Sequence, residues 1–151
     1  MKIGGVEVTR AEEVLVLPRQ GDNLVFKAQA VLDMEAFDAL CPKPTPPVRL
    51  TKDGKKEHKS GEYLAQLTRW GEQRYAYVLI QSLKPSDIEW GIVKEDDPNS
   101  WLKWVDDFKS AGLADTEINR VQQLVLDANA LNETKLKAAR EAFLVGQGKK
   151  A

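Results

Sequence analysis

The spacing of apolar residues changes along this chain, from short β-rich runs near its start to recurrence at three- and four-residue steps later on. The runs at residues 14–18 and 24–31 are joined by a glycine-containing loop of about five residues, which predicts an antiparallel hairpin. Residues 6–8 are the candidate for a third strand. Because a lone hairpin is only marginally stable in water, we expect this sheet to pack against another part of the chain.

Helical spacing dominates from residue 61 onward. One helix is predicted from Gly61 to about Leu83. Gly71 inside it costs about 1 kcal/mol relative to alanine, so we expect this glycine to mark a close contact with another helix. Asp97 followed by Pro98 predicts the start of a second helix, with an acidic N-cap and a proline at the first helical position.

Three further positions mark where the later helices begin and end. Gly112 is the expected stop of the second helix. Asp115 and Asn132 are the expected N-caps of the last two helices. The side chains expected to face inward are Ile118, Val121, Leu124 and Val125 in the first of these helices, and Leu136, Ala139 and Phe143 in the second. Residues 88–93 fit either a strand or an irregular apolar segment, and residues 146–151 have the composition of a frayed tail.

A connector rich in proline and lysine separates the β-rich segments near the start of the chain from the helical segments. Asp33 is the expected N-cap of a short helix that ends before Pro42. The apolar residues of this helix are Met34, Phe37 and Leu40. Residues 41–60 follow as the connector, and loops of this length are usually functional or disordered.

These patterns together predict an α+β fold in a single domain over residues 1–151. A small antiparallel sheet within residues 1–40 would pack against a bundle of about four helices within residues 61–145. The connector is expected to lie on the surface.

Composition narrows the classes of function. The net charge of −1 argues against a dedicated DNA-binding surface, which usually appears as a basic domain. No apolar run approaches the roughly 20 residues of a membrane-spanning helix, and the start of the sequence has no signal-peptide core. One cysteine cannot form an intramolecular disulfide, so an intracellular compartment is expected. We predict a cytoplasmic protein without a cofactor, a nucleic-acid partner or a membrane partner, and its oligomeric state stays open.

The residues that carry most enzyme and metal chemistry are scarce. Cys41 has no second cysteine or evident base beside it, and is expected to be a small apolar residue that closes a short helix. His58 lies among lysines and is expected to be solvated, as are the lysines of residues 52–59. The acidic run at residues 95–97 fits helix capping before Pro98 better than a metal site or an acid–base pair. No catalytic or metal-binding residue is therefore predicted.

Aromatic residues are the strongest candidates for a binding surface. The tryptophans are Trp70, Trp90, Trp101 and Trp104. Trp101, Trp104 and Phe108 share one face of the helix that follows Pro98. Two interpretations stay open: this face is a core that anchors the helix, or it is an exposed groove that receives a partner segment, since aromatics dominate binding hot spots. In the second case these three residues would contact the partner, with Tyr75 and Tyr77 in a lesser role.

The order of several segments carries a family resemblance. The segments are VFKAQAVL (25–32), FDALCPKP (37–44), RYAYVLIQSL (74–83), IEW (88–90), DPNSW (97–101), EINRV (117–121) and ANALNETKL (128–136). In this order they resemble a family of small tailed-bacteriophage proteins, the tail assembly chaperones. The resemblance covers nearly the whole chain, and its motifs are structural, with no catalytic signature.

The resemblance implies a non-enzymatic chaperone in the host cell cytoplasm. Such a protein is expected to bind the tape-measure protein, a long helical chain that sets tail length, and to keep it soluble during tail assembly. Apolar helix faces on a long partner aggregate unless they are covered, and an aromatic groove would cover them by helix-in-groove contact. Two alternatives stay open, a virion structural or adaptor protein and a host-directed inhibitor that acts by surface binding.

Overall fold

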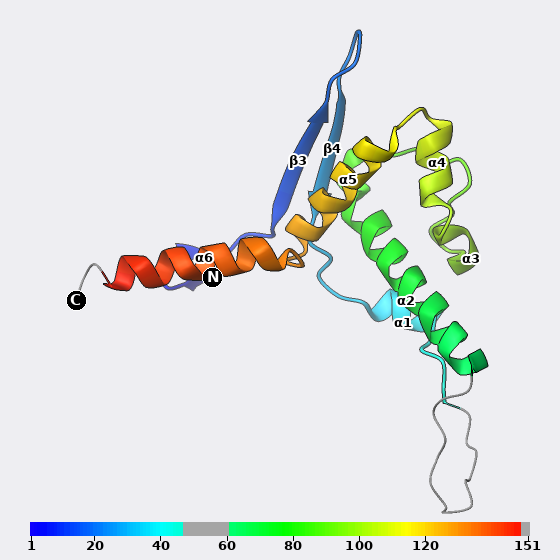
Figure 1. Cartoon of the computed structure of the whole chain (residues 1–151), viewed down its shortest axis with the longest axis horizontal. Coiled ribbons are helices and arrows are strands. Elements are labelled where there is room, and N and C mark those ends of the chain that lie inside the picture. The colour runs from blue at the N-terminus through cyan, green and yellow to red at the C-terminus, as the bar shows by residue number, and fades with distance from the viewer. Residues whose placement is uncertain (47–60, 149–151) are drawn as a thin grey trace, which may run out of the picture. The chain divides into compact units, whose positions relative to one another are not determined.

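The computed structural model of the chain describes residues 1–46 and 61–148 (Figure 1). Its elements in chain order are β1 (Lys2–Ile3), β2 (Val6–Glu7), β3 (Glu12–Leu17), β4 (Leu24–Gln29), α1 (Glu35–Leu40), α2 (Gly61–Ser82), the single-turn 3-10 helix η1 (Lys84–Ser86), α3 (Pro98–Trp101), α4 (Trp104–Ser110), α5 (Asp115–Ala128) and α6 (Glu133–Gly148). The predicted α+β class is confirmed, with antiparallel strand pairs near the start of the chain and helices after them. Among the described residues, no helix combines the length and the apolar composition needed to cross a bilayer.

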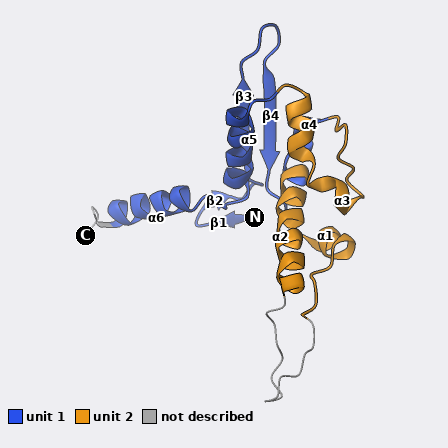
Figure 2. Cartoon of the chain, turned by 45° about the vertical axis from the view of Figure 1, so that its right-hand side comes forward, with its two compact units in different colours: residues 1–31, 81–88, 113–151 blue, residues 32–80, 89–112 orange. Residues whose placement is uncertain are grey.

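The chain divides into two compact units, which we describe in turn (Figure 2). Unit 1 contains residues 1–31, 81–88 and 113–151, and unit 2 contains residues 32–80 and 89–112. This division cuts across the predicted order of a β-rich start and a helical remainder, because unit 1 takes its strands from the beginning of the chain and its helices from the end. A single domain over the whole chain stays a prediction.

The β3–β4 hairpin is the sheet of unit 1 that carries a buried face. The strands pair antiparallel from Glu12 opposite Gln29 to Leu17 opposite Leu24, which confirms the predicted hairpin. Alternate residues point to opposite faces, and the inner face buries Leu17, Phe26 and Ala28. The third predicted strand, β2, does not join this hairpin; it pairs with β1 in a separate two-stranded sheet.

Helix α5 covers the inner face of the hairpin and packs on both of its strands. Its buried side chains are Ile118, Val121, Leu124, Val125 and Ala128, which confirms the inward face predicted for this helix. The predicted cap is wrong by one residue: Ala114 is the N-cap and Asp115 is the first helical residue. Glu117 supplies the capping contact, because its carboxylate accepts a hydrogen bond from the Ala114 N–H at 3.1 Å.

Polar side chains tie the separate segments of unit 1 together. The Asn129 side chain accepts a hydrogen bond from the Val31 N–H at 2.9 Å and donates one to the Ser82 hydroxyl at 2.7 Å. Arg19, just past β3, donates two hydrogen bonds to the Glu117 carboxylate, at 2.7 and 2.9 Å. The hairpin, the start of α5 and the end of α5 are therefore held in one unit.

Unit 2 is built around Phe37 of α1, which is 0% exposed. The ring of Phe37 lies 5.8 Å from Trp70, 5.5 Å from Tyr77 and 6.1 Å from Trp101, measured between ring centroids. Met34, not Asp33, is the N-cap of α1, although the Asp33 carboxylate accepts a hydrogen bond from the Glu35 N–H at 3.2 Å. Apolar spacing found this helix correctly, and the cap prediction missed its start by one residue.

The longer helices of unit 2 differ from prediction in two respects. Helix α2 has nearly the predicted bounds, but a Cβ atom at Gly71 would meet nothing within 4 Å, so the expected close helix contact at this glycine is wrong. Asp97 caps the second helix as predicted, accepting a hydrogen bond from the Asn99 N–H at 3.1 Å. That helix is interrupted after Trp101 and divides into α3 and α4. The predicted stop is confirmed in Gly112, whose φ of +96° is easily adopted only by glycine.

Candidate functional site

The aromatic residues expected to form a partner-binding groove lie in unit 2, and most of them are buried. Trp101 is 0% exposed, and Trp104, Phe108 and Tyr77 are also buried, while Tyr75 is half-buried. The core interpretation accounts for this burial, because each of these rings packs against other aromatic rings of the unit. Contact of these side chains with a partner stays a prediction, and it would require the unit to open.

The indole N–H groups of Trp101 and Trp70 also make hydrogen bonds within unit 2. Trp101 donates from Nε1 to the carbonyl oxygens of Lys94 and Glu95, at 3.1 and 3.2 Å. Trp70 donates from Nε1 to the Cys41 carbonyl at 3.1 Å. A buried indole normally finds such an acceptor, so these tryptophans join loops to helices within unit 2.

Cys41 ends α1 and Asp97 of the acidic run caps α3, as predicted. The Cys41 thiol lies 3.2 Å from the Gln73 side-chain oxygen, and burial raises the pKa of this thiol, which lowers its thiolate fraction at neutral pH. Within residues 1–46 and 61–148, no three His, Cys, Asp or Glu side chains converge where they could hold a metal ion. His58 and the lysines of residues 52–59 lie outside the described residues.

Asp107 is a structural residue that the sequence analysis missed. Its carboxylate accepts hydrogen bonds from the Ile92 N–H at 2.9 and 3.0 Å and from the Val93 N–H at 3.0 Å. A Cβ atom at Gly91 would lie 3.1 Å from the Asp107 carboxylate, so this close approach favours glycine. The ambiguous segment at residues 88–93 is therefore irregular and held by side-chain contacts, because a carboxylate on α4 replaces the neighbouring strand that would complete a sheet.

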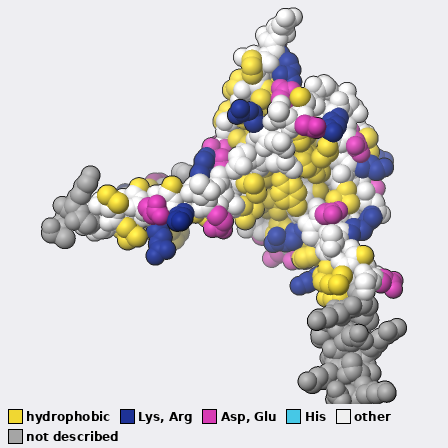
Figure 3. Space-filling view, in the orientation of Figure 1, with side chains coloured by type: hydrophobic (Ala, Val, Ile, Leu, Met, Phe, Trp, Pro, Cys, Tyr) yellow, Lys and Arg dark blue, Asp and Glu magenta, His cyan; other side chains and the backbone are white. Residues whose placement is uncertain are grey.

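Helix α6 carries several exposed apolar side chains. Asn132 is its N-cap, as predicted, and accepts a hydrogen bond from the Lys135 N–H at 3.2 Å. The predicted inward face is wrong: every α6 side chain from residue 133 to 147 is exposed. Leu136 is 45% exposed, Phe143 63%, Leu144 51% and Val145 59%. Leu136, Phe143 and Leu144 lie on one side of the helix at 3.6 residues per turn, and we call these three residues the α6 apolar surface. Figure 3 shows hydrophobic and charged side chains together on this helix.

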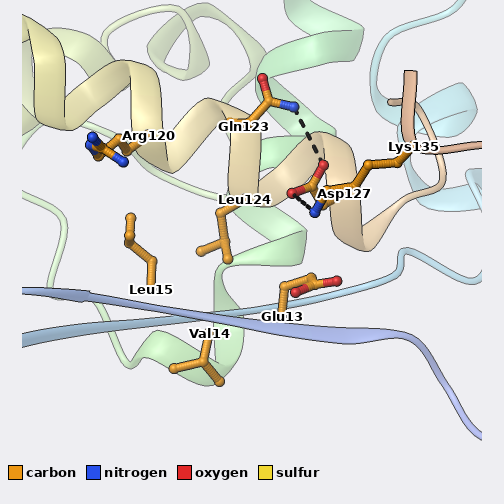
Figure 4. Close-up of a pocket in the computed structure, with 8 residues that line it drawn as sticks. All are labelled: Glu13, Val14, Leu15, Arg120, Gln123, Leu124, Asp127 and Lys135. Atoms are coloured by element: carbon orange, nitrogen blue, oxygen red, sulfur yellow. Dashed lines mark hydrogen bonds and ion pairs between the residues drawn. The ribbon is translucent and has the colours of Figure 1, made fainter. Parts of the chain in front are cut away.

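A second surface feature is a shallow hollow of about 300 Å³ between β3 and α5 in unit 1 (Figure 4). Its lining residues are Glu13, Val14, Leu15, Arg120, Gln123, Leu124, Asp127 and Lys135. Leu15 and Leu124 supply apolar side chains, and charged groups surround them (Figure 4). We call this feature the β3–α5 hollow.

The Asp127 carboxylate, on one side of the hollow, has its charge and hydrogen-bond partners within unit 1. Asp127 pairs with Lys135 at 2.8 Å and accepts hydrogen bonds from Asn132 at 2.8 Å and Gln123 at 3.3 Å. The hydrogen bond from Lys135, followed by those from Asn132 and Gln123, holds the pKa of Asp127 below its ordinary value. This network joins the first turn of α6 to α5, and it leaves Arg120 as the hollow's cation on the opposite side (Figure 4).

No protein-family model, curated protein or solved structure matches the chain. The candidate sites therefore stand on geometry alone. Of these two features, the α6 apolar surface is the one that presents a helix with exposed apolar side chains.

Proposed function

We propose that this chain is a non-enzymatic tail assembly chaperone that binds a tape-measure protein in the host cytoplasm and keeps it soluble. The observation that carries the proposal is the α6 apolar surface, where two leucine side chains and one phenylalanine side chain on one side of a regular helix are about half or more exposed. Exposed apolar side chains grouped on one element are typical of interaction sites. A helical partner with its own apolar stripe is a suitable complement, as in helix-in-groove and helix-to-helix recognition.

The proposal moves the contact from the aromatic residues to α6. Trp101, Trp104 and Phe108 are buried and support the structure of unit 2, whereas Phe143 and Leu144 are accessible without any rearrangement. Many copies bound along one long partner would also gain from avidity. Resemblance to the tail chaperones supplies the identity of the partner, and the exposed helix supplies the means of binding it.

The experiment is a pull-down of the tagged chain from phage-infected cells, with identification of bound proteins by mass spectrometry. The wild-type chain is expected to recover a long helical tail protein. The double variant Phe143→Gln/Leu144→Gln is expected to recover at least about tenfold less, because losing a hot-spot side chain at an interface costs about 2 kcal/mol or more. Lys137→Gln/Glu141→Gln changes two exposed polar residues of the same helix and is the matched control.

The outcomes separate the proposal from its alternatives. Equal recovery by both double variants would show that α6 is not part of the binding surface. Recovery of tail-tube or capsid proteins, with the chain present in purified virions at many copies, would favour a structural or adaptor protein. Recovery of one host enzyme would favour a host-directed inhibitor.

A further inference from the structure

The β3–β4 hairpin has one open edge. The Ala30 N–H donates to the Ala11 carbonyl at 2.9 Å, so these two residues form a hydrogen-bonded pair of the antiparallel ladder. Such pairs alternate with pairs whose backbone groups point away from the partner strand. The register therefore directs the N–H and C=O groups of Glu12, Val14 and Val16 outward, and the described residues show no hydrogen bond to any of them.

On the other edge of the hairpin, along β4, outward backbone groups are hydrogen-bonded to another element. Lys27 lies opposite Val14 and so also points its backbone groups outward, on the β4 side. There the Ser86 hydroxyl accepts from the Lys27 N–H at 2.8 Å and donates to the Lys27 carbonyl at 2.7 Å. Ser86 of η1 thus pairs with the outward backbone groups of Lys27 on β4, whereas the described residues show no hydrogen bond to the outward groups of β3. An uncovered edge of this kind is a template for another strand.

Side chains on both faces of the open edge suit an added strand. On the outer face, Val14, Val16 and Val25 are 61%, 51% and 46% exposed. On the inner face, the β3–α5 hollow lies against the same edge, with Arg120 on the level of Leu15 and Asp127 on the level of Glu13 (Figure 4). A strand added to β3 would bury valines on one face and place alternate side chains in the hollow on the other.

We propose that β3 pairs with β3 of a second copy of this chain, antiparallel and with Val14 opposite Val14 of that copy. This register places Glu12 opposite Val16 of the second copy and matches every outward backbone group with another, giving six hydrogen bonds by the ladder geometry. Shifting the register toward the hairpin loop brings Pro18 into the ladder, and proline has no N–H to donate. The proposed register therefore uses the whole of the open edge and keeps Pro18 out of the ladder.

Charge complementarity favours a second copy over an unrelated strand. In this register Glu13 of the second copy lies opposite Leu15, which puts its carboxylate on the level of Arg120, the cation of the hollow that no described hydrogen bond or ion pair engages. The two-fold axis repeats the pair, so two Glu13–Arg120 contacts form. Because α5 covers the inner face of the hairpin, the two copies of α5 would lie on the same face of the resulting four-stranded sheet.

The test measures the mass of the full chain in solution by sedimentation velocity over a range of concentrations. The wild-type chain is expected to shift from its 16.9 kDa monomer mass toward twice that value. Val14→Pro removes an outward N–H that the hairpin itself does not use, and is expected to abolish the dimer. Val25→Pro is the matched control, since its outward N–H lies on the β4 side, and it is expected to retain the dimer.

Charge reversal tests the register without removing a backbone N–H from the strand. Arg120→Glu alone and Glu13→Arg alone each create two like-charge pairs, and each is expected to weaken the homodimer by at least about tenfold. A mixture of the two variants is expected to restore association, because the mixed dimer has one original and one reversed pair. A wild-type chain that stays monomeric, a dimer that survives Val14→Pro, or charge variants that do not recover on mixing would each overturn the proposal.

Discussion

Phe37 is the residue whose removal should damage unit 2 most. Its side chain is fully buried and lies within 5.5 to 6.1 Å of three aromatic rings, measured between centroids. Truncating a buried phenylalanine to alanine costs about 3–5 kcal/mol, from lost burial and from the cavity that remains. Each aromatic pair adds about 0.5–1.5 kcal/mol beyond area burial, so we expect Phe37→Ala to fall in the upper part of that range.

Intrinsic tryptophan fluorescence is a suitable assay, because all four tryptophans of the chain belong to unit 2. Urea unfolding followed by this signal therefore reports on the unit that contains Phe37. With a denaturant slope of about 1–3 kcal/mol per molar, a loss of 3 kcal/mol or more lowers the midpoint by at least about 1 M. Near-ultraviolet circular dichroism, which depends on fixed aromatic packing, should weaken in parallel.

Phe143→Ala is the control that removes the same atoms from an exposed position. Phe143 is 63% exposed and lies on α6 in unit 1. Its loss should change the free energy of unfolding by no more than about 0.5 kcal/mol, so the fluorescence midpoint should stay nearly the same. If Phe37→Ala and Phe143→Ala shifted the fluorescence midpoint equally, Phe37 would not be the centre of a packed aromatic core, and the account of unit 2 given above would be wrong.

Three further changes test individual contacts. Gly71→Ala should raise the stability of α2 by about 1 kcal/mol, because the added methyl meets nothing within 4 Å; a lower urea midpoint would mean that the site is crowded. Asp107→Ala should lower the stability of unit 2 by about 1–3 kcal/mol, because the Ile92 and Val93 N–H groups lose their acceptor; an unchanged midpoint would refute that role. The folded-state pKa of Asp127 lies below its ordinary value of 3.8, so its stabilising contribution is present above that pH and is lost as the pH falls through the folded-state value. Asp127→Asn should therefore be less stable than the wild type at neutral pH, and the difference should shrink on acidification, as measured by thermal unfolding followed in the far ultraviolet.

Local signals predicted much of the fold. Periodicity located α2 and α5, and turn chemistry located the hairpin, because these elements depend mainly on their own residues. Contacts between distant residues escaped prediction for the opposite reason. Asp107 holds a segment about fifteen residues earlier in the chain, and Arg19 binds Glu117 across almost a hundred residues. No short pattern in a sequence records such a pairing.

The aromatic residues show a further limit. Trp101, Trp104 and Phe108 fit both a core and a groove on spacing alone, since either use requires them to share one helix face. Trp101 packs against Phe37, whereas Trp104 and Phe108 pack against Tyr75 and Trp90. A six-residue helix near the start of the chain thus helps to bury a tryptophan that lies more than sixty residues later.

Helices α5 and α6 show why periodicity alone does not determine burial. Both have apolar residues at helical spacing, but the face of α5 meets the hairpin, whose inner side buries Leu17 and Phe26. The described chain provides no comparable surface for Phe143. A helix of 16 residues is only marginally stable alone in water, and its stability in proteins comes mostly from packing of an apolar face. The order of α6 should therefore increase when a partner covers that face, so hydrogen exchange of its backbone amides should slow on binding, and exchange that is unchanged in the complex would show that the partner binds elsewhere.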